Sequence, residues 1–170
     1  MRIVAGEWRG RIIKAPPGTT VRPTLDRVRE AWMSILQPYL PHARVLDLFA
    51  GSGALGLEAL SRGADTAEFV DNNARSLAVL RDNAAALGTG TRSVITRADA
   101  LRFVAPLEPF AYDVAFADPP YATDAAVRLA QRWLESPFST VFSVEHRSSV
   151  VMPAGGDTRR YGDSSVTLYR

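Results

Sequence analysis

The sequence contains no cysteine, only two histidines and a single lysine among its 20 basic residues. Without cysteine the chain forms neither disulfides nor thiolate metal sites, and it has no cysteine nucleophile. His42 and His146 lie far apart in the sequence, so no metal cluster is expected. No apolar run approaches the ~20 residues of a membrane span, and the N-terminus has no signal-peptide core. We therefore expect a cytoplasmic protein without a bound metal or a membrane partner.

The basic residues that are present gather near the N-terminus. The 170 residues, 46% of them hydrophobic, suit one compact domain. Residues 1–30 hold seven basic and three acidic groups, whereas the rest of the chain is slightly acidic. Arginine suits phosphate oxygens, so this segment favours a polyanionic partner as much as a solvated charged face. The basic residues that could contact such a partner are Arg2, Arg9, Arg11, Lys14, Arg27 and Arg29.

The first forty residues precede a regular alternating pattern. Short apolar and basic runs at residues 1–5 and 10–15 surround a glycine-bounded turn, which predicts a hairpin. Apolar residues then recur at helical spacing after Thr24, a plausible N-cap, and the pattern ends near Pro38. We expect residues 1–20 to form a basic hairpin extension and residues 21–170 to form the main domain.

The main domain alternates strands and helices. Apolar runs predict strands at residues 44–49, 66–71, 93–96, 112–117 and 140–145, with two short strands within 158–170. Helical spacing predicts helices at residues 54–62, 77–87 and 122–134. Repeated βα units indicate an α/β fold with a mostly parallel seven-stranded sheet and helices on both faces. Ligands bind such sheets at the carboxyl ends of the strands.

A glycine-rich segment, residues 47–56, follows the first strand of this domain. Gly51, Gly53 and Gly56 match the dinucleotide-binding spacing, and Asp71 stands where a ribose-binding acid belongs. The pattern indicates a nucleoside-containing cofactor, although glycines can also serve only to form a tight turn. Asp47 would repel a pyrophosphate but suits a ligand with an ammonium and a sulfonium, such as S-adenosylmethionine. An NAD-binding module remains a disfavoured alternative.

Residues 118–121, Asp-Pro-Pro-Tyr, follow another apolar strand. Two prolines fix the backbone and remove two amide donors, which leaves a carboxylate, free carbonyls and an aromatic ring together. This set suits a planar substrate with an exocyclic amine: the ring of the substrate stacks on Tyr121, while Asp118 and a proline carbonyl accept the N–H groups. A Pro-Pro turn with an exposed tyrosine is the purely structural alternative.

Residues 118–121 resemble the DPPY motif of amino-methyltransferases, and residues 47–56 resemble their cofactor motif. Together with residues 22–31, 47–64, the opening Arg2–Gly6 segment and the closing Tyr161-Gly162-Asp163, they resemble the bacterial 16S ribosomal RNA guanine-N2 methyltransferases that modify guanine 966. The resemblance implies a class I Rossmann-like methyltransferase, S-adenosylmethionine as cofactor, and 16S rRNA as partner. We also expect a monomer. Its substrate is either naked 16S rRNA or an assembled or assembling small subunit, and the second is favoured because a short basic hairpin is too small to read a long sequence.

The same resemblance implies the site residues. The catalytic set is Asp118, Pro119, Pro120 and Tyr121. The cofactor set is Arg22, Thr24, Asp47, Phe49, Gly51, Gly53, Asp71, Asn72, Asp99, Ala100 and Asp118. The family more usually has glutamate at position 71, so the ribose contact falls to Asp71 or Asn72.

Some alternatives remain open. DPPY chemistry serves guanine N2 and adenine N6 alike, so an adenine-N6 methyltransferase acting on DNA or RNA is the second hypothesis. A noncatalytic RNA-binding assembly factor is a third, and the intact residues 118–121 argue against it. Trp8 can stack on a base or pack within the hairpin, and Glu145 has no assigned role.

Overall fold

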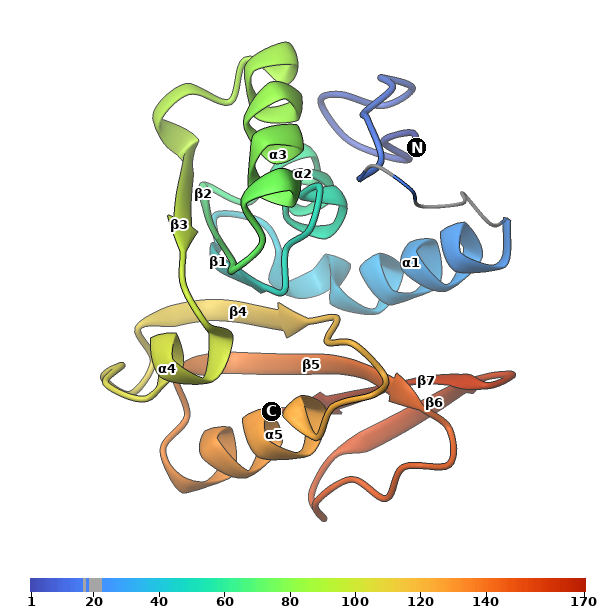
Figure 1. Cartoon of the computed structure of the whole chain (residues 1–170), viewed down its shortest axis with the longest axis vertical. Helices are drawn as coiled ribbons and strands as arrows, with labels where there is room; N and C mark the ends of the chain where they lie inside the picture. The colour runs from blue at the N-terminus through green and yellow to red at the C-terminus, as the bar shows by residue number, and fades with distance from the viewer. Residues whose placement is uncertain (17, 19–22) are drawn as a thin grey trace.

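The computed structural model describes residues 1–16, 18 and 23–170 (Figure 1). Its helices are α1 (Pro23–Leu36), α2 (Ala54–Ser61), α3 (Ala74–Leu87), α4 (Ala100–Val104) and α5 (Ala125–Glu135), with 3-10 turns η1 (Gln37–Tyr39) and η2 (Gly90–Arg92). Its strands are β1 (Arg44–Leu48), β2 (Thr66–Asp71), β3 (Ser93–Arg97), β4 (Tyr112–Ala117), β5 (Ser139–Arg147), β6 (Asp157–Tyr161) and β7 (Ser164–Tyr169). No helix in this part of the chain has both the length and the apolar character to cross a membrane.

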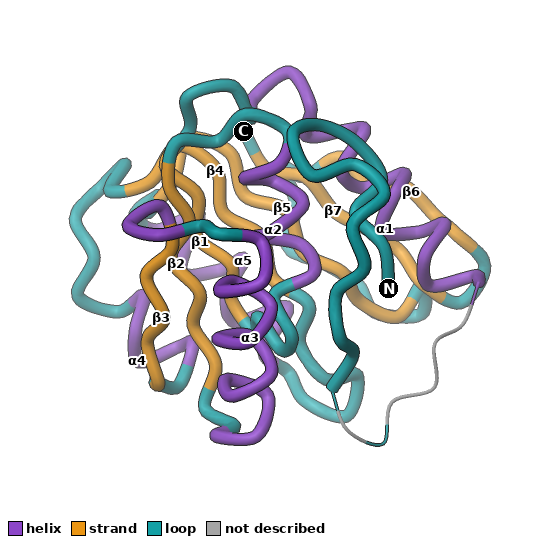
Figure 2. The backbone as a smooth tube through the Cα atoms, turned by 90° about the horizontal axis from the view of Figure 1, so that it is seen from above, coloured by secondary structure: helices purple, strands orange, loops and turns teal. Residues whose placement is uncertain are grey.

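The strands form one sheet in the order β3-β2-β1-β4-β5-β7-β6 (Figure 2). The first five strands of that order are parallel, and β7 is antiparallel to both of its neighbours. The predicted mostly parallel seven-stranded sheet is therefore confirmed. The strand order reverses between β1 and β4, so the loops that follow these two strands diverge and leave a crevice at their carboxyl ends.

Helices cover both faces of the sheet, as predicted. A hydrophobic core lies on each face of the sheet, and neighbouring residues of one strand lie in different cores, because successive side chains of a strand point to opposite faces. Val45 packs with α1, α2 and α3, whereas Leu46 packs with α4 and α5. Figure 1 shows α1 and α5 on opposite sides of β4 and β5.

The N-terminal segment, residues 1–16, forms a hairpin-like pair without regular strands. Its backbone bonds join Ile3 N to Arg11 O and Ile13 N to Met1 O, each at 2.9 Å. Ile3, Trp8 and Ile13 are buried in the core beside α2 and α3. Trp8 is only 7% exposed and therefore packs within the protein rather than presenting its ring to a base.

Three local features differ from the sequence prediction. Helix α1 begins at Pro23, so Thr24 is its second residue and not its N-cap; the fixed φ of proline suits a first helical position. Helix α5 begins at Ala125, because Thr123 closes a turn on the Pro120 carbonyl through its amide and its hydroxyl. Helix α4 was not predicted, since its five residues are too few to show a helical repeat.

Candidate active site

The glycine-rich loop joins β1 to α2 at the centre of the sheet. Gly53, the N-cap of α2, adopts φ 85°, a left-handed conformation that favours glycine. A Cβ on Gly53 would lie 2.2 Å from Leu80 Cδ1, and one on Gly56 would lie 2.9 Å from Asp47 Oδ2. Phe49 also has a positive φ, 57°, which side chains adopt rarely. The motif thus sets a tight backbone path over the end of β1.

Asp47 lies beneath this loop and is 1% exposed. Its Oδ2 accepts a 2.9 Å hydrogen bond from Gly56 N, whereas Oδ1 is buried without a hydrogen-bond partner among the described residues. Burial raises the pKa of Asp47 to about 8; the Gly56 N–H opposes the rise, and the charge of Asp71 adds to it. The loop therefore covers a carboxyl group with an unused acceptor oxygen.

Asp71, at the end of β2, connects the glycine-rich loop to α3. Its Oδ2 accepts from Gly51 N at 2.9 Å, and its Oδ1 accepts from Asn73 N at 2.8 Å. The side chain of Asn73 in turn caps α3 by accepting from Arg75 N and Ser76 N. Each oxygen of Asp71 retains a further acceptor position. Asn72 beside it is exposed.

Asp99 and Ala100 lie at the end of the neighbouring strand, β3. Asp99 is the N-cap of α4, and its Oδ1 accepts from Arg102 N at 3.0 Å. Ala100, the first residue of α4, is buried. The two predicted residues therefore open the short helix that the sequence pattern did not reveal, at the same edge of the sheet as Asp71.

A cavity of about 720 Å³ opens between the loops that follow β1 and β4. It brings together several of the predicted residues: Phe49, Gly51, Asp118, Pro119, Pro120 and Tyr121. Its wall also includes Leu25, Asp26, Arg29 and Trp32 of α1, and Glu145 of β5. Asp47, Gly53, Asp71, Asn72, Asp99 and Ala100 do not line this cavity. Arg22 lies outside the described residues, as does the side chain of Thr24.

Asp118 directly follows β4 and is exposed to the cavity, and its backbone amide donates to Leu48 O at 3.4 Å. Its pKa is raised well above the ordinary value. The main cause is the loss of water around the carboxyl group, and the like charges of Glu145 and Asp47 add to the rise in pKa. Asp47, Asp118 and Glu145 thus lie close enough that the ionisation of one of them disfavours the ionisation of Asp118.

Tyr121 is held by its hydroxyl while its ring stays partly open. The hydroxyl donates to Glu145 Oε1 at 2.8 Å and lies 2.6 Å from Ser164 Oγ. Ser164 also donates to Glu145. Burial, opposed by Ser164 and reinforced by Glu145, raises the pKa of Tyr121 to about 12, so the hydroxyl stays protonated. These bonds fix the ring of a residue that is 38% exposed.

Glu145 is the functional candidate that sequence reasoning left unassigned. It is 8% exposed within a strand whose other central residues are mostly apolar. A single acid in such a strand was a signal, but its partners come from the loop after β4 and from β7. Only the fold brings Glu145, Tyr121 and Ser164 together.

The basic residues predicted to contact RNA differ in whether their side chains are exposed or already bind other parts of the protein. Arg9 and Arg27 are exposed. Arg11 donates to Ala86 O at 2.7 Å, Lys14 pairs with Asp82 at 3.4 Å, and Arg2 reaches Gly10 O at 3.5 Å. Arg29 is packed, with its side chain 11% exposed, and donates to the Arg2 carbonyl and to Met1 Sδ.

Comparison with known proteins extends over the whole chain. The family model described as Conserved hypothetical protein 95 matches residues 1–170. The Bacillus subtilis protein YlbH is 35% identical, over 100% of this chain and 98% of YlbH. The Haemophilus influenzae Ribosomal RNA small subunit methyltransferase D is 30% identical, over 100% of this chain and 92% of that protein. The protein of that name from Escherichia coli is 41% identical, over 71% of this chain and 60% of its own length.

A solved structure shows the same fold. The Escherichia coli protein yhhF superposes with a TM-score of 0.84 and 32% sequence identity, covering 99% of this chain and 96% of its own. The superposition thus covers nearly the whole of both chains. The chain therefore belongs to the Conserved hypothetical protein 95 family, and it is a methyltransferase with the Rossmann-like fold.

Proposed function

We propose that the protein transfers a methyl group from S-adenosylmethionine to the exocyclic N2 of guanine 966 in 16S ribosomal RNA. One observation carries the proposal: the glycine-rich loop and the Asp118–Tyr121 segment, far apart in the sequence, line one cavity. A cofactor motif and an amine-binding motif that share a cavity are what a direct transfer between two bound molecules requires.

The residues present fit this cofactor. Asp47 has a buried oxygen without a partner among the described residues, and the charges of Asp71, Asp118 and Glu145 lie near enough to repel one another or Asp47, a repulsion that a cationic ligand would relieve. Phe49, Gly51 and Gly53 would hold the cofactor along the loop. Further contacts would come from Arg22 and Thr24, from Asp71 or Asn72 at the ribose, and from Asp99 and Ala100 at the adenine. When bound, S-adenosylmethionine supplies a methyl group already activated by its sulfonium.

The target base would stack on the fixed ring of Tyr121. Asp118 and a proline carbonyl would accept the two N–H groups of the exocyclic amine and turn its lone pair toward the methyl carbon. After the new N–C bond forms, the nitrogen gives up one proton. That proton can pass to water after the transfer, so no dedicated base is required.

Ribosomal RNA is the proposed substrate because relatives bear the name Ribosomal RNA small subunit methyltransferase D. The basic residues 1–20 would act as an arm for RNA, and residues 21–170 would carry the catalytic domain. We further propose that a cytoplasmic monomer acts on the assembled or assembling small subunit, whose shape would supply specificity that a short arm cannot.

Replacement of Asp118 tests the assignment of roles. Asp118→Asn should abolish methyl transfer yet leave the affinity for S-adenosylhomocysteine nearly unchanged, measured by titration calorimetry. Asp113→Asn is a matched control, since Asp113 lies at the opposite end of β4 and pairs with Arg44 outside the cavity. Equal loss of turnover and of cofactor affinity in Asp118→Asn would contradict the proposed role.

A further inference from the structure

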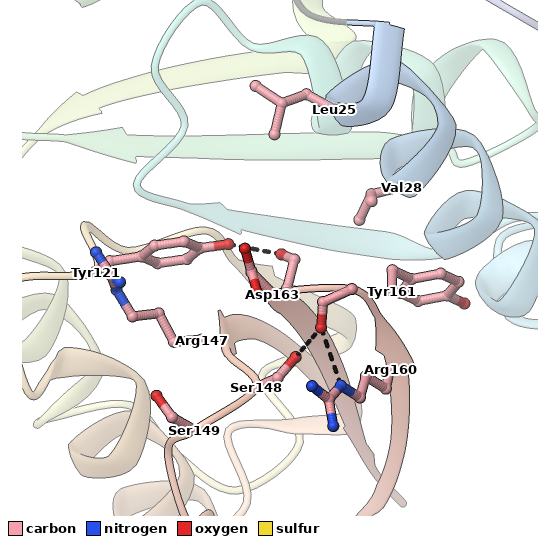
Figure 3. Close-up of a pocket in the computed structure, with 11 residues that line it drawn as sticks. Leu25, Val28, Tyr121, Arg147, Ser148, Ser149, Arg160, Tyr161 and Asp163 are labelled. Atoms are coloured by element: carbon pink, nitrogen blue, oxygen red, sulfur yellow. Dashed lines mark hydrogen bonds between the residues drawn. The ribbon is translucent and has the colours of Figure 1, made fainter.

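A second cavity, of about 930 Å³, adjoins the one that contains Asp118. The two cavities share Leu25 and Tyr121 as wall residues. The rest of the second cavity comes from Val28 of α1, from the end of β5 with the loop that follows it, and from the β6–β7 hairpin, as Figure 3 shows. A substrate whose base stacks on Tyr121 would therefore extend directly into this space.

Two arginines give the second cavity a positive character. The guanidinium of Arg147 lies over the Tyr121 ring, 5.1 Å from its centroid. Arg160 donates through Nε to Gly162 O at 3.0 Å, which leaves its terminal nitrogens available. Neither arginine forms an ion pair with any residue that the structure describes. Asp163 is the one acidic residue among the described lining, so the cavity carries a net positive charge.

The loop that follows Arg147, the last residue of β5, is hydrogen-bonded to the β6–β7 turn. Ser148 N donates to Asp163 O at 2.8 Å, and Ser148 Oγ donates to Gly162 O at 2.8 Å. Both arginines therefore project from a hydrogen-bonded frame (Figure 3). A frame of this kind reduces the entropy lost when the two cations engage a ligand.

We propose that this second cavity binds the RNA backbone next to the target guanine, with Arg147 and Arg160 contacting its phosphates. The inference rests on the proposed function, because a base can reach Asp118 only after it leaves its stack. The phosphates that flank such a base must then lie beside Tyr121. Two unpaired guanidinium groups in that position complement a polyanion, and the planar group of Arg147 can also stack.

This placement adds a second RNA-contacting region to the N-terminal arm. Basic residues of the arm already bind other parts of the protein, as Arg11 and Lys14 do. The arginines of the second cavity are less engaged and lie nearer to the reacting base. We therefore assign them to local positioning of the target nucleotide, and the arm to distant contacts.

Substitution of the two arginines tests the proposal. We would assay Arg147→Gln, Arg160→Gln and the double variant with small subunits from a strain that lacks the enzyme. The double variant should raise KM several-fold to about tenfold, because charge-assisted hydrogen bonds to phosphate are lost. The slope of log Kd against log salt should fall by roughly 0.7–0.9 per lost contact. The affinity for S-adenosylhomocysteine should stay unchanged, which also shows that the variants are folded.

Arg159→Gln is the matched control. Arg159 is the strand neighbour of Arg160, is not among the described lining of the cavity, and lies 3.9 Å from Asp157. It should leave KM and the salt slope unchanged. The inference would be overturned if KM and the salt slope were unaltered in the double variant, or if Arg159→Gln changed both as much as the double variant does. Methyl transfer by the wild type would still support the proposed function in either case. Absence of both transfer and rRNA binding in the wild type would refute the proposed function and this inference with it.

Discussion

Among single residues, Asp47 makes the stability of the ligand-free protein depend on pH. Its folded-state pKa of about 8 lies above that of an exposed aspartate, so the folded state binds a proton more tightly than the unfolded chain. That stabilisation is present below about pH 4 and is lost as the pH rises to about 8. Asp47→Asn removes the ionisation and keeps an acceptor for Gly56 N.

We therefore predict that Asp47→Asn is more stable than the wild type at high pH. The difference in free energy of unfolding should grow between pH 5 and pH 8.5 by on the order of 2–4 kcal/mol. Urea unfolding at several pH values measures it. Parallel pH profiles for the two proteins would show that Asp47 is already ionised in the folded state.

The hydroxyl of Tyr121 is the second residue whose contacts predict a measurable effect. Tyr121→Phe leaves the buried Glu145 without one of its donors, which should lower the free energy of unfolding by about 1–3 kcal/mol. The freed ring should also lower kcat several-fold. Tyr161→Phe is the control for stability, since that hydroxyl bonds to no described residue. The kcat is compared with that of the wild type, because Tyr161 lines the second cavity. If both variants behave like the wild type, the Glu145 bond does not position the ring.

Residues that form the site differ in how far a sequence can reveal them. Backbone conformation and close packing require glycine at positions 53 and 56, so the spacing of the two glycines is visible in the sequence as a motif. Asp118 and Tyr121 are visible for the same reason, since two prolines lie between them. Glu145 is not, because its role depends on the pairing of β5 with β7 and on the loop after β4.

Between elements, α2 anchors the N-terminal segment. The buried Glu58 accepts from Val4 N and Ala5 N at 3.0 Å each, and also from Arg62 Nε. Asn83 of α3 donates to Lys14 O at 2.9 Å and to Ser52 O at 3.0 Å. The segment is thus tied to two helices and, through Asn83, to the glycine-rich loop.

Two glycines of that segment provide a matched pair of substitutions. Gly6 and Gly10 both have φ 85°, but a Cβ on Gly6 would lie 1.8 Å from the backbone oxygen of Ser61, whereas one on Gly10 meets no atom within 4 Å. Gly10→Ala should cost about 1–2 kcal/mol of stability through backbone strain alone. Gly6→Ala should cost clearly more, because the segment must move away from α2. Equal thermal midpoints for both variants would contradict this docking.

Elements with a clear period were predictable from the sequence. The ranges of β2 and β4 were predicted to the residue, since each is an apolar run bounded by turn residues. The short helix α4 was missed, because its fold depends on the Asp99 cap and on packing against α5. The start of α5 shifted by three residues, because a turn held by Thr123 takes the place of its first turn.

For the whole molecule, the fold separates two positively charged regions that a linear count of charge does not distinguish. The arm docks against α2 through Glu58 and Ser61, whereas Arg147 and Arg160 line the cavity that Tyr121 borders. The sequence predicted the first region from local charge. The second was not predicted, because the pairing of β5, β7 and β6 brings together residues that are isolated in the sequence.

The N-terminal arm, residues 1–20, leads to a prediction about rRNA binding. Replacing Arg9 and Arg11 together with glutamine should weaken binding to 16S rRNA and lower the slope of log Kd against log salt, because phosphate contacts release counterions. The kcat at saturating substrate should change little, since neither residue lines the active-site cavity. Filter binding at several salt concentrations measures both quantities. An unchanged affinity and slope would remove residues 1–20 from the RNA surface.

The central claim concerns the reaction itself, and one assay tests it. Labelled S-adenosylmethionine would be supplied with unmodified 16S rRNA and, separately, with small subunits that lack the modification. The RNA would then be digested and its nucleosides identified by mass spectrometry. The proposed function predicts label in N2-methylguanosine. Label in N6-methyladenosine instead, or none despite bound S-adenosylhomocysteine, would contradict the proposed substrate.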